Sequence, residues 1–146
     1  MTTIADQLRR IVDDAAPRLG RMSEADVTRE RGPDKWVKKQ ILGHLIDSAI
    51  NNDVRFVLAQ LADPFVGPGY NQNVWNAAHG YRERRWTELV HLWVAINEHL
   101  AHAMARIPDA KLNVRCVIGA AAPVTLEWLI NDYVEHLEHH LEQILA

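Results

Sequence analysis

The sequence predicts an all-α fold, a bundle of four long helices formed by a single domain over residues 1–146. The first observation is a length of 146 residues with 48% hydrophobic and 24% charged residues, the usual balance of one globular domain. The second is that apolar residues recur at three- and four-residue spacing in four long segments. The third is that strand-like alternation is confined to Leu112–Ile118, a run too short to found a sheet. Because each helix must bury its apolar face, an antiparallel bundle is the simplest arrangement.

The first two long helices are separated by the helix-breaking pair Gly32-Pro33. We expect Thr3 to cap the first helix, which runs to about Gly20. The second helix is expected from about Asp34 to Leu61. Its apolar positions follow the helical period closely: Ile41, Leu42, Leu45, Ile46, Ala49, Ile50, Val54, Val57, Leu58 and Leu61.

The remaining helices follow a loop at residues 63–69, which contains two prolines and two glycines. Residues 72–79 fit a short helix, and residues 83–108 fit the third long one. After an irregular stretch, Thr125 is a good N-cap for a last helix that runs to the C-terminus.

Composition argues against several classes of protein. A net charge of -3 and a pI near 6.2 are unlike those of nucleic-acid binders, so we expect no nucleic-acid partner. No window approaches the roughly 18 uninterrupted apolar residues of a membrane span, and residues 1–10 do not resemble a signal peptide. The single cysteine, Cys116, excludes an internal disulfide and a cysteine-based metal site. We therefore expect a cytoplasmic protein without a membrane partner.

Two of the histidines in the last helix are predicted to face the bundle. Successive helix residues are rotated by about 100°, so sequence position gives direction. His140 lies near the apolar direction and His136 at its flank, whereas His139 points to solvent. Because His136 and His140 are four residues apart on one face, both rings can reach one ion at the roughly 2.0–2.1 Å of a zinc–nitrogen bond. A pair of one packed and one solvated histidine remains an alternative.

A polar ridge on the second helix supplies a third histidine. His44, Ser48, Asn51 and Arg55 follow one another at helical spacing on a helix that is otherwise apolar. Buried polar groups cost free energy unless a metal, a ligand or a partner satisfies them. The alternative for His44 is a core histidine bonded to the backbone. Arg55 could hold an anionic substrate or bridge to a partner subunit.

The other candidates are expected to be structural or exposed. Asp47 points about 100° away from the neighbouring ridge, so we give it no role beside His44. Tyr133, three residues before His136, could reach the site with its hydroxyl, but we expect it to pack in the core. Histidines 79, 91, 99 and 102 are expected on the surface.

Two histidine-containing segments resemble the DinB/YfiT-like superfamily. Residues 34–52, which include the string Gly-His-Leu-Ile-Asp, are similar to that family's second helix, and residues 125–144 are similar to its last helix. Tyr70, Gln72 and Trp75 lie where such proteins have a loop leading to the third helix. The resemblance spans nearly the whole chain in the right order.

The resemblance implies an up-down-down-up four-helix bundle, usually a homodimer, in which three histidines bind a metal. By match to the motif these are His44, His136 and His140, the same three that the helical directions select. Two positions depart from the family. Val37 stands where a capping Ser or Thr is common, and Asn71 replaces a common acidic residue.

Three imidazoles leave a divalent ion with open coordination positions, which is typical of catalytic sites. We expect zinc or nickel, although imidazole also suits copper and iron. The resemblance implies a small-molecule substrate and either thiol S-transfer, with a low-molecular-weight thiol as co-substrate, or hydrolysis. We expect Ser48, Asn51, Arg55, Tyr70 and Gln72 to line the cavity. A non-catalytic metal-binding stress-response or interaction module is the alternative, and a metal-free bundle is the third possibility.

Overall fold

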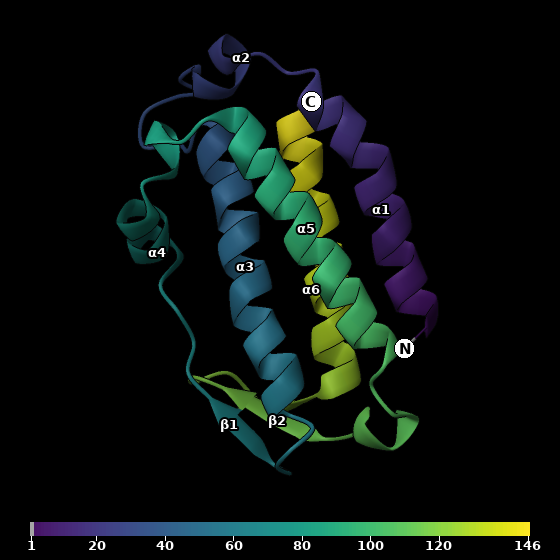
Figure 1. Cartoon of the computed structure of the whole chain (residues 1–146). Coiled ribbons are helices and arrows are strands. Elements are labelled where there is room, and N and C mark those ends of the chain that lie inside the picture. Colours follow the sequence, from purple (N-terminus) through teal and green to yellow (C-terminus); the bar gives the residue numbers. More distant parts are fainter. Residues whose placement is uncertain (1) are drawn as a thin grey trace.

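Four long helices form the bundle in the computed structural model, which describes residues 2–146 (Figure 1). They are α1 (Thr2–Gly20), α3 (Lys38–Leu58), α5 (Trp86–Ala105) and α6 (Leu126–Leu145). α1 and α6 run in one direction, and α3 and α5 run in the other. The order along the chain is therefore up-down-down-up, as the family resemblance implied.

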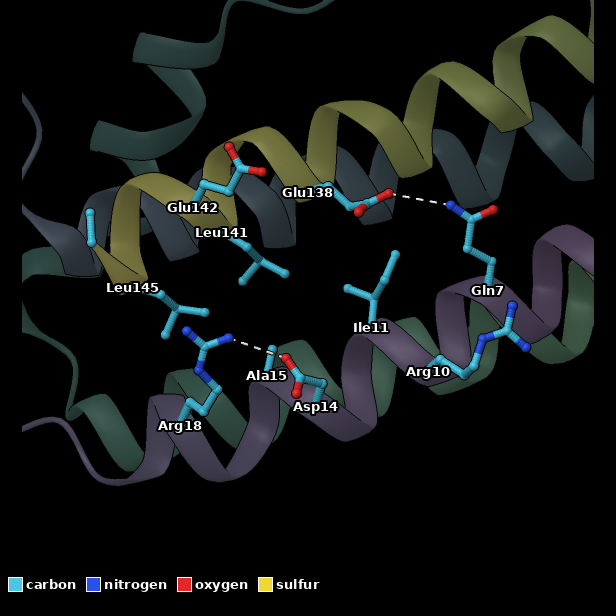
Figure 2. A pocket seen from close by; sticks show the side chains of 11 residues that line it. Gln7, Arg10, Ile11, Asp14, Ala15, Arg18, Glu138, Leu141, Glu142 and Leu145 are labelled. Carbon is cyan, nitrogen blue, oxygen red and sulfur yellow. Dashed lines mark hydrogen bonds and ion pairs between the residues drawn. The ribbon is translucent and has the colours of Figure 1, made fainter.

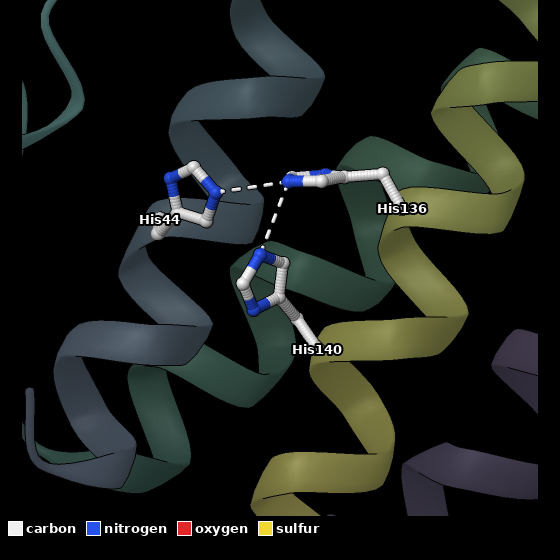
Figure 3. A group of neighbouring side chains, drawn as sticks. All are labelled: His44, His136 and His140. Carbon is white, nitrogen blue, oxygen red and sulfur yellow. Dashed lines mark hydrogen bonds between the residues drawn. The ribbon is translucent and has the colours of Figure 1, made fainter.

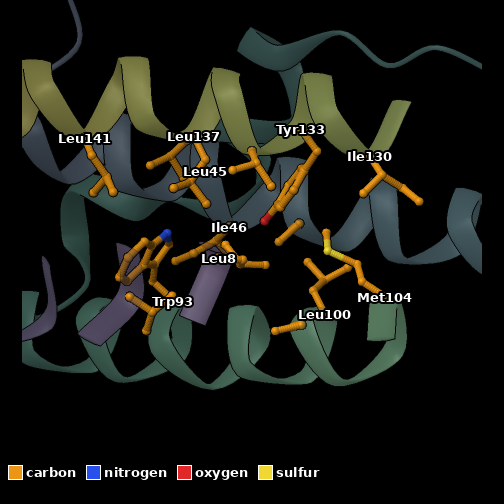
Figure 4. Packing of buried hydrophobic residues seen from close by; sticks show 14 of the residues in the cluster. Leu8, Leu45, Ile46, Trp93, Leu100, Met104, Ile130, Tyr133, Leu137 and Leu141 are labelled. Atoms are coloured by element: carbon orange, nitrogen blue, oxygen red, sulfur yellow. The ribbon is translucent and has the colours of Figure 1, made fainter. Parts of the chain in front are cut away.

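Each long helix packs against two others around one core. α5 contacts both α1 and α3, α3 contacts α6, and α6 closes the ring against α1. Each helix contributes large buried side chains to the centre, such as Leu8, Ile46, Trp93 and Leu137 (Figure 4). Fully burying a side chain of this kind contributes roughly 1.5–3 kcal/mol. The apolar stripes seen in the sequence are thus the surfaces on which the helices meet.

Short helices occupy the connections. The 72–79 helix is present as α4 (Gln72–His79), capped by Asn71, whose side-chain oxygen accepts hydrogen bonds from the next turn. Two 3₁₀ turns, η1 (Tyr81–Glu83) and η2 (Asp109–Lys111), flank α5.

A further short helix, α2 (Glu24–Thr28), was not expected from the sequence. Its start is a reciprocal capping box, in which Ser23 and Asp26 each accept a hydrogen bond from the other's backbone N–H. The buried Lys39 ammonium lies 2.6 Å from the Glu24 carboxylate, which ties α2 to the start of α3. The box was visible in the sequence as Ser-x-x-Asp.

A three-stranded sheet closes one end of the bundle. We expected the run Leu112–Ile118 to be too short to form a sheet, and the structure shows that this expectation was wrong. β2 (Arg115–Ile118) pairs in parallel with β1 (Phe65–Gly67), placing Phe65 opposite Cys116, and antiparallel with β3 (Val124–Thr125). Because β1 and β2 are about fifty residues apart in the chain, their pairing leaves no local periodicity to detect.

Several helix boundaries differ from the sequence-based ones. The first helix already includes Thr2, so Thr3 is not its cap. α3 begins at Lys38 rather than near Asp34, because Asp34 has a left-handed backbone (φ 57°) and Val37 is extended. Valine has no oxygen with which to cap a helix, and instead the Gln40 side chain accepts a hydrogen bond from the Val37 N–H (3.0 Å).

The later boundaries are closer to expectation. The third long helix begins at Trp86, after the 3₁₀ turn that takes up residues 81–83, and it ends at Ala105 rather than Pro108. Thr125 caps α6 as predicted, because its hydroxyl accepts a hydrogen bond from the Trp128 N–H (3.1 Å). Within residues 2–146, none of the helices combines the length and the apolar character needed to cross a membrane.

Candidate metal centre

The three imidazoles selected from the sequence converge on one point between α3 and α6 (Figure 3). The Nε2 atom of His136 lies 3.3 Å from that of His44 and 3.1 Å from that of His140. All three ligand atoms lie within 4.8 Å of one another. Each ring therefore presents a nitrogen to the same small volume.

These separations fit a shared cation. Nitrogens bound at 2.0–2.1 Å around a tetrahedral ion are about 3.4 Å apart. Two of the measured separations are close to that value. The fit arises because His136 and His140 are one helical turn apart and α6 lies directly against α3.

The electrostatics of the site keep the rings of His44 and His136 neutral. Burial, together with the neighbouring His136 and His140, lowers the pKa of His44 to about 4. Burial likewise lowers the pKa of His136 to about 4, helped by His140 and His139. Neutral imidazoles carry the free lone pair that a metal requires, so at neutral pH these two rings are ready to coordinate.

Two side chains that the sequence analysis did not identify support the rings. The Nδ1 atom of His140 is 2.9 Å from Oε1 of Gln143. Because an amide oxygen only accepts, Nδ1 carries the hydrogen and Nε2 is left with its lone pair. Trp36 packs against His44, with ring centroids 5.2 Å apart. Gln143 lies three residues after His140 on the same helical face, but this spacing is too common to identify the contact from the sequence.

The Nδ1 atom of His44 is buried without a hydrogen-bond partner among the described residues. His44 itself is only 2% exposed. An imidazole that is nearly sealed from water and leaves one nitrogen unsatisfied is costly. Coordination through Nε2 would give this buried ring a favourable interaction, while Nδ1 would then carry the hydrogen and still have no acceptor among the described residues.

Three of the predicted cavity residues form a polar cluster further along α3. Ser48 is buried, and its side chain hydrogen-bonds with Tyr70, whose pKa is nevertheless raised by burial. Arg55 lies over the Tyr70 ring, 5.7 Å from its centroid, and donates to the Pro68 carbonyl (3.4 Å). The structure thus joins Ser48, Arg55 and Tyr70 to one another and not directly to the three imidazoles.

The other two predicted cavity residues lie apart from this cluster. Asn51 donates to the backbone carbonyl of Asp47 (2.9 Å), so its amide is turned back along its own helix. Gln72 lines a pocket of about 370 Å³ beside the histidine cluster. Both Trp36 and Gln143, which contact the histidines, also line this pocket; the remaining lining residues are Arg31, Asp34, Lys35, Ile41 and Asn73.

The remaining histidines lie outside the cluster. His91, His99, His102 and His139 are exposed, as expected. The side chain of His79 is also partly exposed (43%), yet its Nδ1 atom lies 2.7 Å from a carboxylate oxygen of the buried Asp47.

Asp47 and Tyr133 also take the places expected of them. The Asp47 carboxylate is directed to Tyr81 and His79 rather than to the three imidazoles. Tyr133 is in the core, where its hydroxyl donates to Oδ1 of Asn97 (2.5 Å).

Comparison with known proteins places this architecture in a family. The fold is similar to that of YfiT from Bacillus subtilis, described as "a probable metal-dependent hydrolase with an unusual four-helix bundle topology". The TM-score is 0.80 at 18% sequence identity, over 96% of this chain and 83% of that one, and a likeness at this identity concerns the fold. No curated protein matches by sequence. The sequence model of the DinB superfamily matches residues 7–144, and the chain therefore belongs to the DinB superfamily.

Proposed function

We propose that this protein binds one divalent metal ion through His44, His136 and His140 and uses it in catalysis on a small molecule. The observation that carries the proposal is the convergence of three Nε2 atoms, in which that of His136 lies 3.1 Å from that of His140 and 3.3 Å from that of His44. Burial keeps the rings of His44 and His136 neutral. The description of YfiT as a probable metal-dependent hydrolase supports the same reading.

Three protein ligands leave room for water or a substrate atom in the remaining positions. When bound, a divalent ion lowers the pKa of a coordinated water or thiol enough to form hydroxide or thiolate near neutral pH. The chain's own part is to hold the imidazoles in place. Gln143 fixes the tautomer of His140, and Trp36 packs against the ring of His44.

The reaction we propose is hydrolysis, or S-transfer from a low-molecular-weight thiol to a small electrophile. Zinc and nickel both suit a site made of neutral nitrogen ligands. The adjoining pocket of about 370 Å³ fits a small-molecule substrate. Its charged wall residues are the cations Arg31 and Lys35 and the anion Asp34, and the excess of positive charge favours a substrate that bears a negative charge. No nucleic-acid or membrane partner is part of this proposal.

The test separates metal binding from catalysis. Purified protein is reconstituted with zinc or nickel, its metal content is measured, and turnover of small esters, and of epoxides and halides with a thiol present, is recorded. The His140→Ala variant is expected to lose the metal and the turnover together, whereas His91→Gln, an exposed control, should keep both. Full metal occupancy without turnover on the panel would refute the enzymatic part, and failure to take up metal would refute the whole proposal.

A non-catalytic, metal-binding stress-response or interaction module is the second candidate, and the burial of His44 favours it. A ligand that is 2% exposed suits a closed structural site. This reading predicts that chelation lowers the melting temperature greatly while ligand exchange at the ion is slow. A metal-bound water that exchanges rapidly and is displaced by azide would exclude it.

We also propose that the protein is a cytoplasmic homodimer. A groove of about 470 Å³ between α1 and α6 has apolar side chains such as Ile11 and Leu141 between its two edges (Figure 2). Arg10 on the α1 edge and Glu142 on the α6 edge form no ion pair among the described residues. In a two-fold pair, the Arg10 edge of one chain can meet the Glu142 edge of the other.

Charge reversal tests this dimer. Arg10→Glu alone and Glu142→Arg alone should each shift the protein toward monomer in sedimentation velocity, because like charges then face each other across the interface. The double variant should recover the dimer. A monomeric wild-type protein, or single variants that dimerise normally, would contradict this interface.

A further inference from the structure

A buried carboxylate outside the metal centre holds two other side chains in place. Asp47 on α3 is 0% exposed. Its Oδ1 atom accepts a hydrogen bond from the Tyr81 hydroxyl (2.6 Å) and lies 2.7 Å from Nδ1 of His79. The Tyr81 oxygen is in turn 3.0 Å from the same Nδ1. The three groups form a closed polar cluster that the proposed metal chemistry does not use.

The backbone around this cluster leaves it little freedom. Gly80 ends α4 in a left-handed conformation (φ 60°), which turns the chain so that both His79 and Tyr81 face α3. The Tyr81 ring lies against Gly43, where an added Cβ would be only 2.1 Å from Cδ2 of the ring. The Asn76 amide donates to the Gln40 carbonyl (2.8 Å) and ties α4 to the same helix.

The contacts determine which ring nitrogen of His79 carries the hydrogen. A carboxylate only accepts hydrogen bonds, and the Tyr81 hydroxyl already uses its hydrogen on Asp47. Nδ1 of His79 must therefore be the donor to Asp47, and Nε2 keeps its lone pair. This is the role that a buried aspartate has in hydrolase triads, where it holds the imidazole tautomer and stabilises the imidazolium that forms.

The free nitrogen belongs to a side chain that reaches solvent beside a small pocket. His79 is partly exposed and lines a pocket of about 210 Å³ together with Val74, Trp75 and Ala78. The Trp75 ring is perpendicular to the His79 ring, with centroids 5.7 Å apart. Apolar and aromatic walls beside a single basic nitrogen suit a small aryl or alkyl ester.

We propose that His79 is a catalytic general base of a second, metal-independent site that hydrolyses small esters, with Asp47 and Tyr81 as positioning residues. Nε2 takes a proton from water as the water oxygen bonds to the ester carbonyl carbon. The tetrahedral intermediate then breaks its bond to the leaving oxygen, which receives the proton from Nε2. The products are one acid and one alcohol, and the imidazole returns to its neutral form.

The first test determines which ring nitrogen of His79 carries the hydrogen. The proposed catalytic role requires the hydrogen on Nδ1, whereas a purely structural role does not. Long-range ¹⁵N–¹H correlation spectra of the chelator-treated protein should show His79 with hydrogen on Nδ1 and a bare Nε2. Asp47→Asn should disturb this assignment, whereas Tyr81→Phe should preserve it if the variant folds. A wild-type His79 with its hydrogen on Nε2 would overturn the proposal.

The second test measures hydrolysis of 4-nitrophenyl acetate by the protein in excess chelator, so that the metal centre makes no contribution. We expect a rate at least ~10²-fold above that of free imidazole, a usual contribution of a positioned general base. His79→Gln should remove this excess and Asp47→Asn should reduce kcat with little change in KM, while His102→Gln, an exposed control, should leave both unchanged. A His79→Gln variant that is folded and as active as the wild type would refute the site and leave the metal proposal unaffected.

Discussion

A single hydrogen bond beside the metal centre, from Nδ1 of His140 to the Gln143 side chain, determines which nitrogen of the His140 ring is free to bind a metal. Helical periodicity is enough to select His44, His136 and His140, because direction around a helix follows from sequence position. It did not identify Gln143, whose role depends on a hydrogen bond to the far side of the His140 ring. A glutamine at helical spacing from a histidine is common on helix surfaces, so the residue pair alone does not reveal the contact.

We predict that Gln143→Leu weakens metal binding by about 10–100-fold, the usual effect of removing a group that orients a ligand. Leucine is close to glutamine in volume but cannot accept the hydrogen from Nδ1, so His140 is free to adopt the wrong tautomer. Competition with a chromophoric chelator measures the affinity. Gln72→Leu is the matched control, because Gln72 lines the same pocket and is exposed. Equal losses in the two variants would show that the pocket, not the hydrogen bond, is responsible.

At the scale of the elements, the close contact between α3 and the η1 turn explains why a glycine, which helical propensity disfavours, lies within α3. Gly43 lies inside α3, where glycine costs roughly 1 kcal/mol relative to alanine. Its hydrogen atom faces the ring of Tyr81, which leaves no room for a side chain. Glycine is therefore needed for the packing of the η1 turn, and through that turn for the Asp47 cluster.

Gly43→Ala is expected to lower the free energy of unfolding by about 1–3 kcal/mol, because the cost of overpacking against Tyr81 outweighs the gain in helix propensity. Gly20→Ala is the matched control, since a Cβ on this last residue of α1 meets nothing within 4 Å. Urea unfolding followed by circular dichroism measures both variants. A Gly43→Ala protein as stable as the Gly20→Ala protein would contradict the packing described for Tyr81.

For the whole molecule, the buried histidines couple the stability of the fold to pH. The pKa values of His44 and His136 are lowered to about 4 in the folded protein, whereas an unfolded chain has histidine pKa values near 6.5. Between these two values the unfolded state binds more protons than the folded one. Acid therefore favours unfolding in this range.

We predict that the free energy of unfolding of the metal-free protein falls as the pH decreases from about 6.5 to about 4. Below the folded-state pKa, both states are protonated and this contribution stops changing. Denaturant unfolding at a series of pH values measures the slope. His44→Gln should reduce the slope across this interval, and the exposed control His91→Gln should not. An unchanged slope in His44→Gln would show that other groups control the acid sensitivity.

The sequence by itself determined the four amphipathic helices, the short 72–79 helix, the Thr125 cap and the inward direction of the three histidines. All of these depend on residues within a few turns of one another. Only the tertiary structure decided the β1–β2 pairing, the contact of Tyr81 with Gly43 and the joining of Asp47 to His79. Those contacts join residues about thirty to fifty positions apart, and which of them form depends on how the helices pack rather than on any local pattern.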